Sequence, residues 1–226
     1  MFRDSIKHIF FDLDHTLWDF EKNSEITFKL IFNKHKIPFE IKNFIDVYRP
    51  INLKYWNMYR NNQISSKNLR HERLKEVFSI LGYNYNRALI DLIADEYIEY
   101  LSRQIHLFPH ATTILDYLSE RYELHIITNG FENIQHKKLY ASKIDHYFKT
   151  VTTAEGSGYK KPDSRIFDYA LNTAKAKPKE SLMVGDSLEA DIQGAKDFGM
   201  PAVYFGKNSN FEIVNIECLS ELKQLL

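Results

Sequence analysis

The sequence predicts an α/β fold with a parallel sheet that is interrupted near its start by an all-helical insertion. Three observations support this prediction. A short apolar run, 9–11, ends in two aspartates; residues 19–102 show helical but no strand periodicity; and strand and helix patterns alternate from residue 111 onward. Such alternation is typical of a parallel sheet with helices on both faces.

The first strand ends in a chemically unusual pair of residues. Ile9 to Phe11 are β-branched or aromatic, which is typical of a buried central strand. Asp12 and Asp14 follow two residues apart, so an extended chain would point both carboxylates to the same side. Burying a carboxylate is costly unless it is paired or bound to a metal. A functional site is therefore expected here, and ordinary capping residues after a strand are the alternative.

The insertion is predicted to contain four helices. Each segment has apolar residues at helical spacing, and the third stops at Gly82, a residue type that commonly ends helices. The expected helices cover about residues 23–31, 44–60, 67–81 and 86–103. Some eighty residues thus form a helical block inserted directly after the first strand.

The second half of the chain supplies the remaining strands. We expect helices at 111–120, 132–142, 164–175 and 189–198, strands at 123–130, 149–153, 181–184 and 201–205, and a loop at 154–160. Two of these strands end in polar residues, Thr128-Asn129 and Gly185-Asp186. Ligands of parallel sheets bind outside the carboxyl ends of the strands, so these residues are expected near Asp12.

Composition excludes several classes of function. Lys plus Arg and Asp plus Glu both number 30, so the net charge of zero argues against nucleic acid or an anionic membrane as the main partner. A single cysteine, Cys218, excludes an internal disulfide and suits a reducing compartment. The start of the chain lacks a secretory pattern, and a cytoplasmic location is expected. The nine histidines are scattered without the spacing of a zinc site.

Four short motifs occur in the order found in the haloacid dehalogenase (HAD) superfamily. Asp-Leu-Asp-His-Thr-Leu from Asp12 resembles the first motif, Thr128-Asn129-Gly130 the second, Lys161 before Pro162 the third, and Gly185-Asp186-Ser187 with Asp191 the fourth. The resemblance implies a Rossmann-like catalytic core, residues 1–17 and 104–226, and a helical cap domain, residues 18–103.

The resemblance also implies roles for individual residues. Asp12 would be the nucleophile that becomes an aspartyl-phosphate, and Asp14 the acid and base. Thr16, Thr128, Asn129 and Lys161 would bind phosphate. Mg²⁺ would be held by Asp12, the backbone carbonyl of Asp14, and Asp186. Asp191 would support the site by holding Lys161 or a metal-bound water, or would only favour a helix start. His15 and Trp18 are candidate substrate contacts.

Asp14 favours phosphate chemistry over other reactions of the superfamily. Members that cleave carbon–halogen bonds lack an acid at this place, whereas the leaving group of a phosphate ester needs a proton at neutral pH. The expected function is a Mg²⁺-dependent phosphomonoester hydrolase with a small phosphorylated metabolite as its partner, acting as a monomer or homodimer without nucleic acid or membrane.

The subfamily resemblance is to YjjG-type pyrimidine 5'-nucleotidases, through residues 18–23 and the cap as a whole. A nucleoside 5'-monophosphate is therefore the expected substrate. The alternatives are a phosphatase of sugar phosphates or phosphoglycolate, a phosphomutase, and a non-catalytic binding protein of the same fold. Six aromatic residues either stack on a base or form the core of the cap: Trp18, Phe20, Tyr48, Tyr55, Trp56 and Tyr59.

Overall fold

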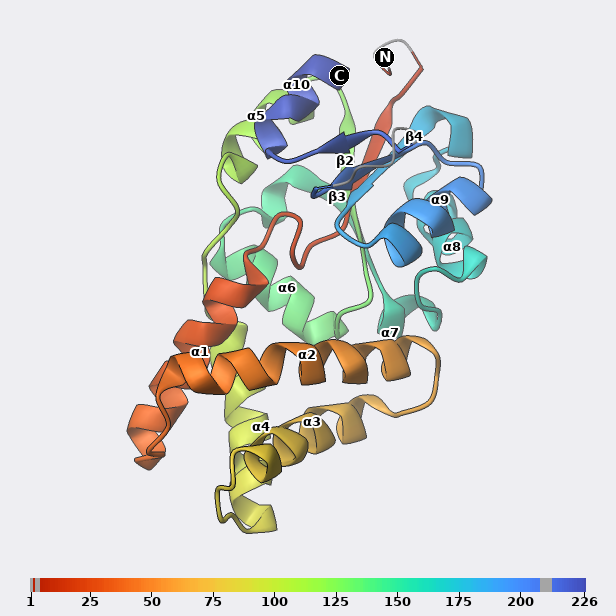
Figure 1. The fold of residues 1–226 in the computed structure, drawn as a ribbon. Coiled ribbons are helices and arrows are strands. Elements are labelled where there is room, and N and C mark those ends of the chain that lie inside the picture. The colour runs from red at the N-terminus through yellow and green to blue at the C-terminus, as the bar shows by residue number, and fades with distance from the viewer. Residues whose placement is uncertain (1, 3–4, 208–212) are drawn as a thin grey trace. The chain divides into compact units, whose positions relative to one another are not determined.

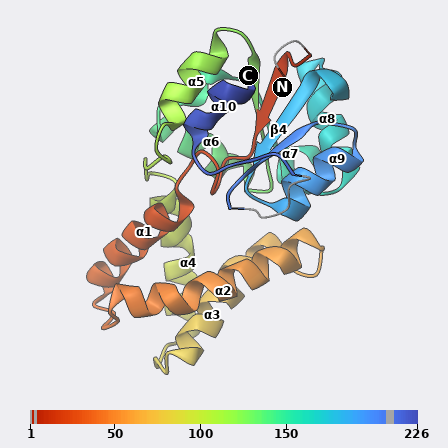
Figure 2. The same cartoon turned by 45° about the horizontal axis from the view of Figure 1, so that its top comes forward.

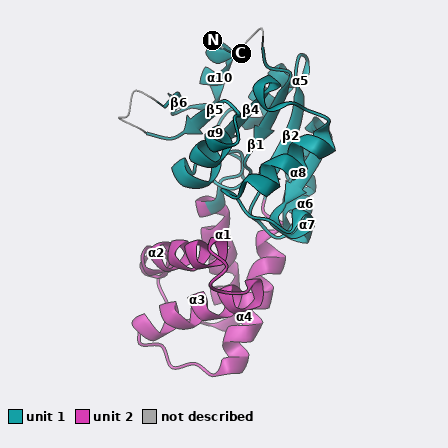
Figure 3. Cartoon of the chain, turned by 90° about the vertical axis from the view of Figure 1, so that its right-hand side faces the viewer, with its two compact units in different colours: residues 1–20, 105–226 teal, residues 21–104 magenta. Residues whose placement is uncertain are grey.

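The chain forms two compact units in a computed structural model that describes residues 2, 5–207 and 213–226. Residues 1–20 and 105–226 make up the first unit, and residues 21–104 make up the second (Figure 3). The first unit carries the sheet and every motif named above. Among the described residues, no helix combines the length and the apolar character that crossing a membrane requires.

The first unit is built on a six-stranded sheet in the order β3-β2-β1-β4-β5-β6, with every neighbouring pair parallel. This confirms the predicted parallel α/β fold. The strand order reverses between β1 and β4, and ligands of such sheets bind at that point, beyond the carboxyl ends of the strands. The strands are β1 (His8–Phe11), β2 (Glu123–Thr128), β3 (Phe148–Thr153), β4 (Ser181–Gly185), β5 (Ala202–Phe205) and β6 (Asn215–Ile216), of which β6 was not predicted.

Helices cover both faces of the sheet. The helices α8 and α9 lie on one face, and α5, α6 and α10 lie on the other (Figures 1 and 2). The predicted loop at 154–160 contains a short helix, α7. The bounds are α5 (Ala111–Ser119), α6 (Glu132–Ala141), α7 (Ala154–Ser157), α8 (Ser164–Ala174), α9 (Gly194–Asp197) and α10 (Leu222–Leu225), with single turns η1 (Asp145–Tyr147), η2 (Pro178–Glu180) and η4 (Leu219–Glu221).

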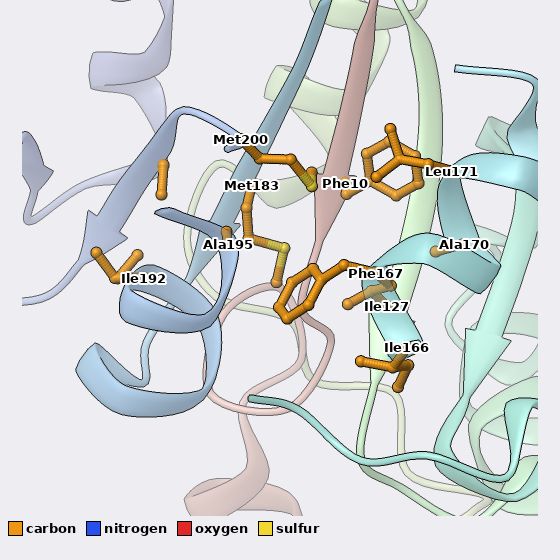
Figure 4. Close-up of a cluster of buried hydrophobic side chains, with 11 residues drawn as sticks. Phe10, Ile127, Ile166, Phe167, Ala170, Leu171, Met183, Ile192, Ala195 and Met200 are labelled. Carbon is orange, nitrogen blue, oxygen red and sulfur yellow. The ribbon is translucent and has the colours of Figure 1, made fainter. Parts of the chain in front are cut away.

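Alternation along β1 divides its apolar side chains between the two faces. Phe10 joins Met183 of β4 and Ile127 of β2 in a buried cluster that includes residues of α8 and α9 (Figure 4). Ile9 and Phe11 are also fully buried. The strand that leads to Asp12 is therefore held by packing on both sides.

The helix predicted at 189–198 is wound in two ways. Its first part, η3 (Leu188–Gln193), is a π-helix, and the rest is α9. The backbone N–H groups of Asp191 and Ile192 both donate to the carbonyl of Ser187, at 2.9 and 3.1 Å. Wide turns of this kind are frequent at functional sites, and this one carries Asp191.

The second unit consists of helices packed around an aromatic core. Phe28 lies within 4.7 Å, ring centre to ring centre, of both Phe44 and Tyr48, and within 4.4 Å of Tyr97. Tyr48, Tyr55 and Tyr59 are buried, which supports the interpretation that they form a core rather than a stacking surface. The helices are α1 (Phe20–His35), α2 (Ile41–Arg60), α3 (Ser66–Ile80) and α4 (Arg87–Leu101).

We predict that Phe167→Ala lowers the free energy of unfolding by about 3–5 kcal/mol, because it leaves a cavity in the cluster of Figure 4. The matched control is Tyr169→Ala on the same helix, where the residue is 44% exposed and the expected loss is within about 0.5 kcal/mol. Urea unfolding followed by circular dichroism measures both. Equal losses in the two variants would contradict the assigned core.

Candidate active site

A tight loop turns the chain immediately after β1. The N–H of Asp12 donates to the carbonyl of Val184 at 2.9 Å and so extends the pairing with β4 by one residue. The N–H groups of Leu17 and Trp18 both donate to the carbonyl of Leu13, at 3.0 and 2.8 Å. The loop therefore holds Asp12 and Asp14 at the carboxyl edge of the sheet.

Lys161 is a buried cation at the centre of this edge. Its side chain is 2% exposed, and its Nζ donates to Asp12 Oδ1 at 2.6 Å, Asp191 Oδ1 at 2.6 Å and the carbonyl of Ile127 at 2.7 Å. These three acceptors match the three protons of an ammonium group. Lys161 thus joins residues from the ends of β1 and β2 and from η3.

Asp191 is fixed at both of its carboxylate oxygens. Oδ1 accepts from Lys161, and Oδ2 accepts from the N–H of Ser187 at 3.0 Å. A Cβ atom added at Gly185 would lie 2.3 Å from Asp191 Oδ2, so only glycine leaves room for this carboxylate. Of the roles open for Asp191, this geometry supports the one in which it holds Lys161.

The site has more negative than positive charge. Burial raises the pKa of Asp12 well above its usual range. Lys161 acts to lower this pKa, whereas the negative charges of Asp191 and Asp186 act to raise it further. Burial, followed by Asp191, raises the pKa of Asp186 to about 7. Burial alone would lower the pKa of Lys161, but Asp12 and Asp191 together raise it above its ordinary value. One ammonium group therefore faces three carboxylates.

The donor set fits a hard divalent cation. Carboxylate oxygens of Asp12, Asp186 and Asp191 lie within 4.8 Å of one another, and Mg²⁺ prefers oxygen ligands. Both carboxylate oxygens of Asp191 accept hydrogen bonds, from Lys161 and Ser187, whereas Lys161 binds Asp12 through Oδ1. The carboxylates suited to bind an ion are therefore those of Asp12 and Asp186. A cation there would offset the burial and the mutual repulsion that raise the pKa values of Asp12 and Asp186.

Asp14 is held by two side chains of α6. Lys138 Nζ lies 2.6 and 2.9 Å from the two oxygens of Asp14, and Gln135 Nε2 donates to Oδ2 at 2.9 Å. A Cβ atom at Gly130 would lie 2.4 Å from the Gln135 amide carbon, so the small residue leaves space for this side chain. Asp12 and Asp14 are thus fixed by different cations.

Sequence reasoning did not identify Lys138 or Gln135. Both are buried, and Lys138 Nζ lies 4.4 Å from the ring centre of Trp18, a cation–π contact. A signal was present, because Gln135 and Lys138 follow Phe131 by four and seven residues and so share its buried helical face with Leu139. Polar residues on such a face are candidates for a functional site.

The second motif lies beside this pair. Thr128 Oγ1 accepts from Gln135 Nε2 at 2.8 Å and from the N–H of Gly130 at 3.1 Å. The Asn129 side chain binds the backbone of Lys161 on both sides, with Oδ1 accepting at 2.7 Å and Nδ2 donating at 3.0 Å. The side chain of Asn129 therefore positions Lys161. Phosphate binding by Asn129 stays a prediction, and it would have to use the backbone of this residue.

The other predicted residues of the first motif differ in exposure. Thr16 is fully buried, and its hydroxyl has no hydrogen-bond partner among the described residues. Trp18 is also fully buried, whereas His15 is partly exposed and packs on Phe20 with a ring-centre distance of 5.0 Å. Phosphate binding by Thr16 and substrate contact by His15 and Trp18 stay predictions. His15 is the better candidate for a substrate contact, because Trp18 is fully buried.

Comparison with known proteins gives one matching family. The family described as haloacid dehalogenase-like hydrolase matches residues 9–205 of this chain. The match spans the loop after β1, Thr128, Lys161 and Asp186. It thus covers all four motifs recognised in the sequence.

Curated relatives cover most of the chain. Pyrimidine 5'-nucleotidase PynA of Streptococcus pneumoniae is 31% identical over 88% of this chain and 83% of its own. Pyrimidine 5'-nucleotidase YjjG of Escherichia coli is 31% identical over 96% of both chains. A glyceraldehyde 3-phosphate phosphatase of Methanothermobacter thermautotrophicus is 30% identical over 98% of this chain and 100% of its own.

A solved structure of the putative HAD-hydrolase YfnB from Bacillus subtilis shares the fold. It is 25% identical, covers 99% of both chains and gives a TM-score of 0.90. The family match, the relatives and this likeness agree with the arrangement of carboxylates and lysines at the carboxyl edge of the sheet. The chain belongs to the haloacid dehalogenase-like hydrolase family and is a phosphatase of that family.

Proposed function

We propose that this protein is a Mg²⁺-dependent phosphomonoester hydrolase that works through an aspartyl-phosphate on Asp12. The observation that carries the proposal is the separate fixing of two neighbouring carboxylates. Asp12 is held by buried Lys161, whereas Asp14 is held by Lys138 and Gln135. A nucleophile and an acid–base group need different environments, and this arrangement supplies them.

The first half-reaction transfers the phosphoryl group to the protein. A carboxylate oxygen of Asp12 attacks phosphorus, and the bond between phosphorus and the ester oxygen of the substrate breaks. Protonated Asp14 gives its proton to that oxygen, so the leaving group departs as an alcohol. Lys161 fixes Asp12 through Oδ1, and we assign the attack to Oδ2.

The second half-reaction releases phosphate. Asp14, now a carboxylate, takes a proton from water while the water oxygen attacks phosphorus. The bond between phosphorus and Asp12 breaks, which returns both carboxyl groups to their starting states. Lys138 and Gln135 orient Asp14 through both halves, and Asn129 and Asp191 keep Lys161 in place.

Mg²⁺ is the proposed cofactor, with Asp12 and Asp186 as its side-chain ligands and the backbone carbonyl of Asp14 as a third. When bound, it supplies positive charge that offsets repulsion between the phosphate and the attacking carboxylate. Two observations support this choice: the oxygen-only donor set and the pKa of Asp186, which burial raises to about 7. The solved structure of YfnB is described as bound to magnesium.

We infer that the substrate is a nucleoside 5'-monophosphate, with pyrimidine nucleotides preferred. Two of the relatives are named pyrimidine 5'-nucleotidases. The tyrosines of the second unit give little support, because Tyr48, Tyr55 and Tyr59 are buried in its core. A small sugar-type phosphate is the second candidate, since other relatives of similar identity are named glyceraldehyde 3-phosphate phosphatases.

Asp12→Asn is expected to lower kcat for any phosphomonoester by roughly 10⁴-fold or more, because an amide is a poor nucleophile. The fold should remain, since the Asn amide oxygen can still accept from Lys161. Phosphate release from p-nitrophenyl phosphate and circular dichroism measure the two effects. Activity within tenfold of the unmodified protein would remove Asp12 as the nucleophile.

Lys138→Met tests whether Lys138 positions the acid. Methionine keeps the apolar contact with Trp18 but loses the ion pair with Asp14. We expect kcat to fall about tenfold or more for an alkyl phosphate and less for p-nitrophenyl phosphate, whose leaving group needs little protonation.

The matched control for this variant is Lys137→Met, which changes an exposed lysine on the same helix. It should leave kcat for both substrates within twofold, about the scatter expected for a surface change. Equal losses of kcat for the two substrates in Lys138→Met would show that Lys138 has no role in acid catalysis.

A side-by-side assay of phosphate release separates the substrate classes. The panel contains dUMP, UMP, dTMP, AMP, glucose 6-phosphate, phosphoglycolate and glyceraldehyde 3-phosphate, with Asp12→Asn as the background control. Pyrimidine deoxynucleotides are expected to have the highest kcat/KM. A tenfold lead for any non-nucleotide would overturn the nucleotidase assignment and leave the phosphatase assignment intact.

A further inference from the structure

Two histidines and a glutamate meet at the amino end of the sheet, opposite the catalytic edge. His8 begins β1, Glu123 begins β2, and these two residues are directly paired in the sheet register. His125 follows Glu123 by two residues, so all three side chains lie on the same face. His8 precedes Asp12 by four residues, which corresponds to about 13 Å along an extended strand.

Two of the three distances between the candidate ligand atoms match a tetrahedral metal site. His8 Nδ1 lies 3.2 Å from His125 Nε2 and 3.5 Å from Glu123 Oε2. Ligand atoms bound to zinc at 2.0–2.1 Å in a tetrahedron are separated by about 3.3–3.4 Å. The three ligand atoms all lie within 4.8 Å of one another. They can therefore occupy three corners around one ion, with the fourth left for water.

Two contacts fix the position of the His125 ring. Its Nδ1 lies 2.9 Å from Thr150 Oγ1, and its ring stacks on Phe10 with centres 4.6 Å apart. In the tautomer in which Nδ1–H donates to Thr150, the lone pair of Nε2 is available for a ligand bond.

We propose that His8, Glu123 and His125 bind a Zn²⁺ ion, with water as the fourth ligand. Two nitrogens and one carboxylate oxygen form a donor set that zinc accepts and that Mg²⁺, which prefers oxygen, does not. Glu123 is 56% exposed in its side chain, which gives the ion a path from solvent. The nearby Lys7 is paired with Glu180 and does not compete for Glu123.

The competing interpretation is a metal-free hydrogen bond in which His8 Nδ1–H donates to His125 Nε2. That arrangement does not require Glu123. It also predicts no bound ion, so the two interpretations differ in a direct binding measurement. His8 and His125 are 117 positions apart in the sequence, which explains why sequence spacing gave no indication of this site.

The test is isothermal titration of the full chain with Zn²⁺ in a large excess of Mg²⁺, which occupies the oxygen site. Co²⁺ is titrated in parallel, because tetrahedral Co²⁺ has a strong visible absorption. His8→Gln and Glu123→Gln remove one ligand each from partly or largely exposed positions, so neither should affect folding. His146→Gln and Glu120→Gln are the matched controls, since both residues are exposed and lie outside the cluster.

We expect one Zn²⁺ per chain, weakened about 10- to 100-fold or more by either ligand variant and unchanged by the controls. Thr150→Val should weaken zinc binding about tenfold through the loss of the hydrogen bond to His125. The proposal is overturned if no Zn²⁺ binds in the presence of Mg²⁺, or if His8→Gln and Glu123→Gln bind it as tightly as the controls do.

Discussion

The buried ammonium group of Lys161 is the interaction on which the catalytic edge depends. It lies 2.6 Å from carboxylates that come from opposite sides of the strand-order reversal, Asp12 after β1 and Asp191 on η3. Removing one partner from a buried ion pair costs about 3–5 kcal/mol, because the remaining charge is left without compensation. The glycine at 185, the wide turn of η3 and the amide of Asn129 all serve to bring Lys161 and its partners together.

A second cation, Lys138, binds the other aspartate of the first motif, Asp14. Lys138 is buried against Trp18 and binds Asp14, whereas Lys161 binds Asp12. The two carboxylates are only two residues apart in sequence, and each has a cation of its own. The helix α6, which directly follows the second motif, therefore supplies both side chains that hold the proposed acid–base residue.

The two ends of the sheet offer different ligand chemistry. The carboxyl edge gathers oxygen atoms from Asp12 and Asp186, which suit Mg²⁺, while the amino edge gathers imidazole nitrogens from His8 and His125, which suit zinc. Parallel pairing produces both groups, because it aligns the ends of neighbouring strands. Buried tyrosines such as Tyr48 belong to the core of the second unit. They are therefore not available to recognise the part of the substrate beyond the phosphate.

The sequence alone determined the parallel α/β fold, the helical insertion and the ordered motifs at Asp12, Thr128, Lys161 and Asp186, because these depend on local patterns and short spacings. Only the tertiary structure revealed that Lys138 and Gln135 bind Asp14, that the Asn129 side chain is committed to Lys161, and that His8 meets His125. Each of these contacts joins residues that lie on different elements, 32 to 124 positions apart. Local periodicity carries no information about such pairs, whose meeting is decided by strand order and register.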